Sequence, residues 1–266
     1  MSELLTASGP RLTALLLELP AADLAAALDN PNLREEQLVA ALRRRDLSGE
    51  FLATVAKHMG WAGQYLVKVV ITMHPRTPKP VSMNFVKFLF WRDLVKVTNN
   101  FAIDPPVRVA ADNVLAERLD EMELGERIAL ARLGSRSVVR SLKVRREEPV
   151  FAALLMNPRL TEDDLLPLCH DPGTPAGILS LVAQNARWGA RYGLRLALAR
   201  NPATPMAVAL SQLISLNPRD LKDLHQNPSA PKLIRQAALR VLETQNRRRA
   251  GNAGSPGEGG SRPPQN

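Results

Sequence analysis

The sequence predicts an all-α fold, an α-solenoid in which short helices stack into a superhelix. Three observations predict it: a composition poor in aromatic residues, an internal duplication with a 127-residue offset, and short apolar segments separated by turns. Aromatic residues make up 4% and hydrophobic residues 45% of the 266 residues. That composition suits helices packed through aliphatic side chains. No segment alternates apolar and polar positions with β-branched residues, so we expect no strand.

The duplication relates residues 24–115 to residues 151–242. Without a single gap, 27 of the 92 aligned pairs are identical, which chance does not produce. Identical pairs include Asn30 with Asn157, Trp61 with Trp188, Tyr65 with Tyr192, and the motif Pro-x-Thr-Pro at 75–78 with that at 202–205. Short one-sided helices cannot bury their apolar faces individually, and stacking gives them a continuous core.

Individual helices are marked by apolar residues at helical spacing. Clear examples are 162–169, 176–186, 189–200 and 206–215. The turns between them follow a pattern. Proline at a first helical position loses no hydrogen bond, and the threonine before it is expected to cap the helix, as at Thr77, Thr174 and Thr204. Asparagines before the first proline are expected to end helices in the left-handed conformation; they are Asn30, Asn157, Asn201, Asn217 and Asn227.

We divide the chain into five segments. They are an N-terminal helical cap at 1–23, the first half at 24–115, connecting helices of the same solenoid at 116–150, the second half at 151–245, and a disordered tail at 246–266. The tail is rich in Gly, Pro and Ser. No signal peptide is predicted, and no stretch approaches the roughly 20 apolar residues of a membrane span. We therefore expect a cytoplasmic protein.

Three phrases carry a resemblance to a known family. "LGERIALARLGSRSVVRSL" at 124–142, "AALLMNPRLTEDDLL" at 152–166 and "ALARNPATPMAVAL" at 197–210 resemble bacterial leucine-rich-repeat-variant and HEAT-like helical repeats. The resemblance covers most of residues 24–245 and implies a solenoid. It would also imply an iron–sulfur cluster on a cysteine-rich segment, but Cys169 is the single cysteine. We therefore expect no cofactor and no metal.

Aromatic residues supply two candidate contact sites. Trp61 with Tyr65, and Trp188 with Tyr192, stand at i, i+4 and share a helix face, where they form either a stacking ledge for a base or peptide or, as we prefer, core packing. A further group lies between Phe85 and Phe101 and includes Phe88 and Trp91. This stretch is either more deeply buried or exposed as a patch for a partner or a second copy.

Basic residues supply the other candidate contacts. Arg132, Arg136 and Arg140 recur at i, i+4 with Lys143 close behind, and residues 43–45, which include Arg43 and Arg44, form a second cluster. A groove containing both clusters would follow a phosphate backbone. The alternative, which we prefer, is a solvated face balanced by neighbouring acids.

The predicted function depends on the catalytic and nucleotide-binding motifs that the sequence lacks. No phosphate-binding loop, nucleotide fingerprint or hydrolase motif occurs, and the four histidines have no metal-ligand spacing. We expect a non-enzymatic scaffold that binds a protein partner through a concave surface. The alternative is a nucleic-acid-binding module, in one form akin to the HEAT-like alkylpurine DNA glycosylases, with the net charge of +9 as its support. A structural homo-oligomer is the third hypothesis.

Overall fold

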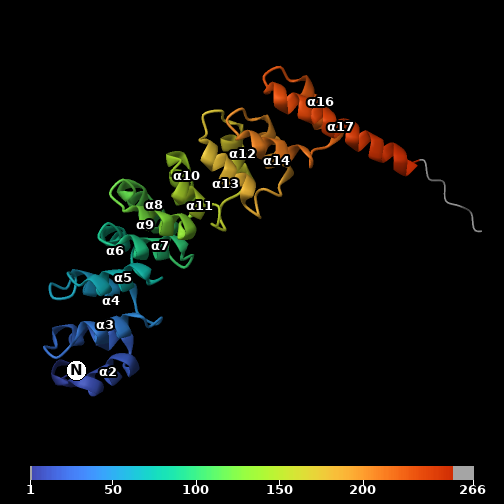
Figure 1. The fold of residues 1–266 in the computed structure, drawn as a ribbon. Coiled ribbons are helices and arrows are strands. Elements are labelled where there is room, and N and C mark those ends of the chain that lie inside the picture. Colours follow the sequence, from blue (N-terminus) through green and yellow to red (C-terminus); the bar gives the residue numbers. More distant parts are fainter. Residues whose placement is uncertain (1, 254–266) are drawn as a thin grey trace, which may run out of the picture. The chain divides into compact units, whose positions relative to one another are not determined.

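The computed structural model describes residues 2–253, and every regular element in that range is a helix (Figure 1). The all-α prediction is therefore confirmed for these residues. In chain order the elements are α1 (Ser2–Thr6), α2 (Gly9–Glu18), the 3-10 helix η1 (Ala21–Asp29), α3 (Glu35–Leu42), α4 (Gly49–Lys57), α5 (Tyr65–Met73), α6 (Lys79–Val86), α7 (Trp91–Asn99), α8 (Pro105–Arg118), α9 (Leu124–Leu133), α10 (Arg136–Arg145), α11 (Glu148–Leu154), α12 (Glu162–His170), α13 (Ala176–Gln184), α14 (Tyr192–Arg200), α15 (Met206–Leu213), α16 (Pro218–Gln226) and α17 (Lys232–Ala253).

The described helices form two compact units, which are divided between Leu142 and Lys143. Their boundary falls inside α10, and therefore inside the predicted connecting segment 116–150. In the first unit α3 packs against α5, α5 against α6 and α7, and α7 against α8. In the second unit α12 packs against α14, α14 against α15, and α16 against α17.

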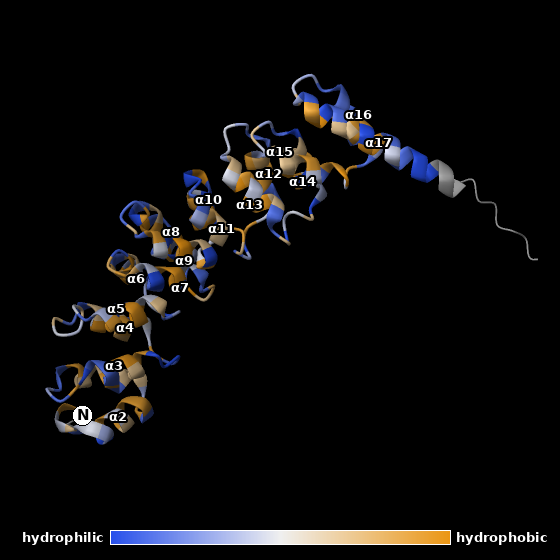
Figure 2. Ribbon diagram, in the orientation of Figure 1, coloured by the Kyte–Doolittle hydropathy of each residue, from blue (hydrophilic) through white to orange (hydrophobic). Residues whose placement is uncertain are grey.

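Each unit is held together by the apolar faces of its short helices. Figure 2 shows hydrophobic residues along helices such as α5, α7 and α14, and hydrophilic residues in many loops and along α10, α16 and α17. Helices of about ten residues are marginal in isolation, so this burial is what stabilises them. Fully buried side chains of the first unit include Leu12, Leu24, Leu42, Leu52 and Ile71, and those of the second include Leu165, Leu179, Leu198 and Leu221.

Asparagines hold the turns by side-chain hydrogen bonds and not by a left-handed backbone. Asn30, Asn201 and Asn227 have φ values of −70°, −78° and −73°. Among the described non-glycine residues, only Arg146 has a positive φ. Each asparagine Oδ1 instead accepts the N–H two residues further on, at 2.7, 2.8 and 3.0 Å. The left-handed prediction is wrong because a turn closed by an asparagine side chain needs no positive φ.

The threonines of the Thr-Pro pairs also act differently from the prediction. The proline is the N-cap of α6, α13 or α15, so each helix begins one residue later than expected. Thr77 Oγ1 donates to the Ile71 carbonyl at 2.6 Å, and Thr174 Oγ1 donates to the Leu168 carbonyl at 2.8 Å. These hydroxyls therefore bond to carbonyls near the end of the preceding helix and do not cap the next one. The Ile71 carbonyl also accepts the His74 N–H.

The C-terminal boundary of the second half differs from the prediction as well. Helix α17 continues to Ala253, so residues 246–253 of the predicted tail are helical. Residues 254–266 of that tail lie outside the described residues. Within residues 2–253, none of the helices combines the length and the apolar character that a membrane span requires.

Cys169 lies on α12 and is fully buried, which has a chemical consequence. Burial raises the pKa of its thiol to about 12, so the thiol is neutral and unreactive at pH 8 because the thiolate is the nucleophile. We expect Ellman's reagent to label the native protein about tenfold or more slowly than the protein unfolded in urea. The same labelling rate in both states would contradict this placement.

Candidate interaction surface

Trp61 and Trp188, which the duplication aligns, make the same hydrogen bond. The Trp61 indole N–H donates to the Leu28 carbonyl at 2.9 Å, and the Trp188 indole N–H donates to the Leu155 carbonyl at 2.9 Å. Trp188 is only 2% exposed, and the Arg187 guanidinium lies 4.2 Å from the centre of its ring. A stacking ledge at Trp188 is therefore wrong, and the packing alternative describes this residue.

Tyr65 and Tyr192 are likewise anchored in equivalent ways. The Tyr65 hydroxyl donates to Asp93 Oδ2 at 2.6 Å and accepts the Phe90 N–H at 3.0 Å. The Tyr192 hydroxyl contacts the Asp220 carboxylate, which the duplication aligns with Asp93. The phenols therefore fix the starts of the helices that carry these aspartates, and they do not present their hydroxyls to a ligand.

These tyrosines allow a prediction about alkaline pH. Burial and then the bond to Asp93 raise the pKa of Tyr65 to about 12, and burial and then the bond to Asp220 raise the pKa of Tyr192. Because the sequence has two tyrosines, the whole phenolate absorbance of the native protein should develop above the ordinary value of about pH 10.

The sign of the effect on stability follows from the same shift. A folded pKa above the unfolded one means that the contribution to stability is fully present below about pH 10 and is lost as the pH rises through 12. Spectrophotometric titration of native and urea-unfolded protein measures the pKa of the tyrosines in both states. Coincident curves would contradict the two hydrogen bonds.

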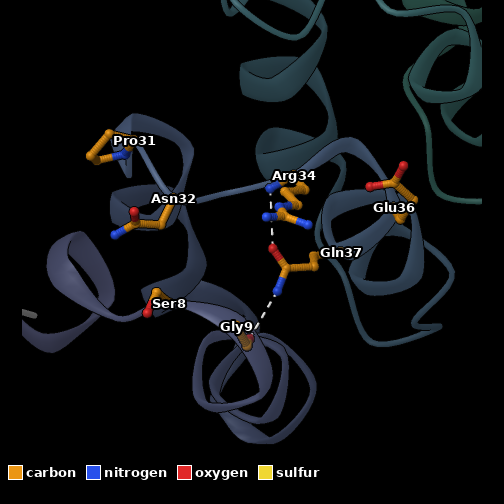
Figure 3. A pocket seen from close by; sticks show the side chains of 7 residues that line it. All are labelled: Ser8, Gly9, Pro31, Asn32, Arg34, Glu36 and Gln37. Atoms are coloured by element: carbon orange, nitrogen blue, oxygen red, sulfur yellow. Dashed lines mark hydrogen bonds between the residues drawn. The ribbon is translucent and has the colours of Figure 1, made fainter.

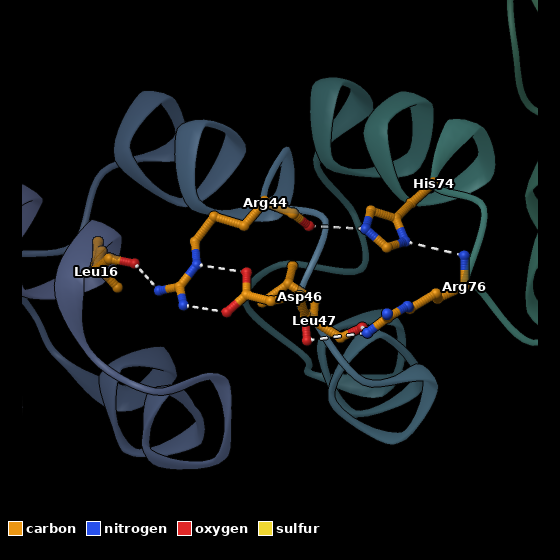
Figure 4. A network of polar contacts seen from close by, with 6 residues as sticks. All are labelled: Leu16, Arg44, Asp46, Leu47, His74 and Arg76. Atoms are coloured by element: carbon orange, nitrogen blue, oxygen red, sulfur yellow. Dashed lines mark hydrogen bonds and ion pairs between the residues drawn. The ribbon is translucent and has the colours of Figure 1, made fainter.

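Arg44, a predicted partner contact, joins parts of the first unit to each other (Figure 4). Its guanidinium donates to the Leu16 carbonyl at 2.8 Å and to Asp46 at 3.1 Å, and the latter bond lowers the pKa of Asp46. Its own carbonyl lies 2.9 Å from His74 Nε2, and His74 Nδ1 accepts the Arg76 N–H at 3.1 Å. The Arg44 guanidinium is thus bonded inside the first unit, with its side chain 13% exposed, and its role as a phosphate or partner contact stays a prediction.

The central basic residues do not share one helix face. Arg132 belongs to α9, whereas Arg136 and Arg140 belong to α10, so a turn interrupts the predicted i, i+4 row. Lys143 lies in the second unit and pairs with Asp164 at 3.5 Å. The prediction of one continuous basic row is therefore wrong. Arg132 and Arg140 are exposed and remain candidate contacts.

The aromatic stretch is divided between core and surface. Phe85 is buried and Trp91 is half-buried, but Phe88, Phe90 and Phe101 are 55%, 66% and 79% exposed. The two alternatives, core and surface, therefore apply to different residues of the same stretch.

The exposed rings are held by neighbouring side chains. Lys68 and Lys87 place their ammonium groups 5.1 and 5.5 Å from the centre of the Phe88 ring, and the Phe90 ring packs on Tyr65 with centroids 4.6 Å apart. We call Tyr65, Lys68, Lys87, Phe88 and Phe90 the Phe88 patch. Large aromatic side chains on an exposed surface are typical of protein-binding sites.

Two cavities of the first unit meet at Lys96. The first, of about 770 Å³, lies among α3, α5 and α7 and includes Arg43, Arg45, Val69, Val70, Met73 and Lys96. The second, of about 530 Å³, lies between α7 and α9 and includes Trp91, Arg92, Val95, Lys96, Asn99 and Leu133. We call these residues the Lys96 surface. Its lining contains four basic residues and not one acid.

A third cavity, of about 510 Å³, lies near the starts of α2 and α3 (Figure 3). The Gln37 amide is bonded within it, because its Nε2 donates to the Gly9 carbonyl at 3.0 Å and its Oε1 accepts the Arg34 N–H at 3.1 Å. Glu36 and Arg34 both line this cavity. Its lining therefore contains both an acid and a base, in contrast to the Lys96 surface.

Sequence reasoning missed Met73, Arg92, Asn99 and Lys96 as site residues, because they are scattered along the chain and form no run or motif. A comparison of the two halves contains the signal. Lys96 stands where the second half has Asp223, and Met73 stands where it has Arg200. The cavity beside α5 therefore owes the charge of Lys96 and the apolar Met73 to positions where the two halves differ.

Among residues 2–253, the His, Cys, Asp and Glu side chains form no group of three that would hold a metal ion. No family model matches the chain, and neither a curated protein nor a solved structure is significantly similar to it.

Proposed function

We propose that this chain is a cytoplasmic α-solenoid of HEAT-like repeats, duplicated with a 127-residue offset, that acts without catalysis as a scaffold for a protein partner. The repeated architecture is supported by the matching hydrogen bonds of Trp61 with Trp188 and of Tyr65 with Tyr192. Two segments with the same sequence pattern and the same anchoring contacts are the expected product of a duplicated stack.

The observation that carries the function is the Phe88 patch. Phe88 and Phe90 are largely exposed, and the aligned residues of the second half are Ser215 and Asn217. Because the second half folds with polar residues at these positions, the fold itself does not require aromatic ones. Exposed aromatic side chains that packing does not explain are best accounted for by a bound protein.

The test uses the second half as the template for a variant. Phe88→Ser with Phe90→Asn gives the first half the residues of the second at exposed positions, so the fold is expected to stay intact, which circular dichroism checks. Proteins retained from a lysate by the wild type are identified and purified, and their affinity is measured by calorimetry. We expect the variant to bind the partner about tenfold more weakly or worse.

Two results would overturn the proposal. Retention of no protein above the level of a column without the chain would remove the scaffold function, and equal affinity of wild type and variant would remove the patch. A steeply salt-dependent affinity for a DNA duplex above that for any protein would favour the nucleic-acid alternative. A concentration-dependent dimer in light scattering, lost in the variant, would favour the homo-oligomer.

A further inference from the structure

The Lys96 surface has an apolar floor that faces solvent. Val69, Val70 and Met73 are half-buried in the larger cavity, and Leu133 is more than half exposed in the smaller one. Cavities of about 300–1,000 Å³ are the size in which proteins bury ligand groups. A ligand with two apolar side chains would therefore place one in each cavity, on either side of Lys96, and remove water from both.

The charges around this floor are unbalanced. Arg43, Arg45 and Arg92 are exposed and form no ion pair with any of the described residues. Lys96 pairs with Asp93 at 2.8 Å, but its side chain is 65% exposed. Helix ends of α3, α5 and α7 lie at the larger cavity, and their partial negative charges of about half a unit each reduce the field of the full cationic charges without cancelling it. An acidic ligand is therefore the complementary one.

The floor of the Lys96 surface favours a peptide over a nucleic acid. Val69, Val70, Met73 and Leu133 are apolar and not aromatic, so they match apolar side chains, whereas bases stack on aromatic rings. Trp91 is the aromatic residue of this surface, and Arg92 lies 5.3 Å from the centre of its ring. Asn99 Nδ2 donates to the Leu133 carbonyl at 3.0 Å, and its Oδ1 is buried, so this oxygen is not offered to a ligand.

On these grounds, and resting on the proposed function, we propose that the Lys96 surface binds an acidic amphipathic peptide segment of the protein partner. The apolar side chains of the segment occupy the two cavities. Its carboxylates meet Arg43, Arg45 and Arg92.

The experiment uses the full chain and a fluorescein-labelled peptide of alternating Glu and Leu, followed by anisotropy. We expect saturable binding that Arg43→Glu with Arg45→Glu weakens about tenfold or more, and that Leu133→Ser, an exposed position, also weakens. The matched control is Arg219→Glu with Arg240→Glu, which makes the same change of charge at exposed positions of the second unit and should leave the affinity unchanged. Circular dichroism checks the fold of each variant.

Several outcomes would overturn the inference. They are equal affinity for a peptide with Lys in place of Glu, equal weakening by the control variant, tighter binding of single-stranded DNA, and a dimer of the chain that Arg43→Glu with Arg45→Glu dissociates. Failure of the proposed function is separate. In one distinguishing result, a partner binds the wild type, binds the Phe88 patch variant more weakly, and binds the Arg43→Glu with Arg45→Glu variant as tightly as the wild type. That result would support the scaffold function and remove this site.

Discussion

Replacing Trp188 with alanine is expected to lower the free energy of unfolding by about 3–5 kcal/mol. Trp188 is 2% exposed, so the change leaves a cavity as large as an indole ring in the second unit. It also leaves the Leu155 carbonyl without the N–H that it accepts at 2.9 Å. Urea unfolding followed by circular dichroism measures the loss.

Two further variants separate the contributions at this position. Trp188→Phe keeps most of the buried ring but removes the N–H, so we expect it to cost less than Trp188→Ala. Trp61→Ala removes the same hydrogen bond from a partly exposed ring, and its cost should be lower because less apolar surface returns to water. A larger loss for Trp61→Ala than for Trp188→Ala would contradict the burial that distinguishes the two halves.

The equivalence of the two tryptophans is the part of the fold that the sequence predicts best. An ungapped alignment of two halves requires that aligned core residues meet similar neighbours, and Trp61 and Trp188 donate to carbonyls that are themselves aligned. The helical nature of the elements also follows from the sequence. Apolar residues at a spacing of three and four share one face of a helix but would fall on both faces of a strand.

The candidate site was harder to predict, because partners of charged residues lie far away in sequence. Lys143 reaches Asp164, and nothing in the local composition indicates that this cation is already used. Arg44 has a local partner in Asp46, but its bond to the Leu16 carbonyl is not visible in the local sequence. Lys96 shows the opposite case. It belongs to no basic run, yet the packing of α3, α5 and α7 places it between two cavities.

The turn residues give the second large prediction, since Asn201 is buried and fully bonded. Its Nδ2 donates to the carbonyls of Cys169 at 2.8 Å and Asp171 at 3.0 Å, and its Oδ1 accepts the Ala203 N–H at 2.8 Å. Asn201→Leu leaves the Cys169 carbonyl and the Ala203 N–H without partners, at about 1–3 kcal/mol each when buried, while the Asp171 carbonyl keeps the Thr174 N–H. We expect a loss of about 3 kcal/mol or more in the free energy of unfolding, measured in urea.

His74, which the duplication aligns with Asn201, supplies the control. Its Nδ1 accepts the Arg76 N–H and its Nε2 lies 2.9 Å from the Arg44 carbonyl, so a neutral ring protonated on Nε2 reproduces the acceptor and the donor of an asparagine amide. His74→Asn and Asn201→His should therefore each lower the free energy of unfolding by about 1 kcal/mol or less. His74→Leu should lower it about as much as Asn201→Leu does. If Asn201→His were as damaging as Asn201→Leu, the two turns would not be interchangeable, and the duplicated architecture would lose its most direct energetic support.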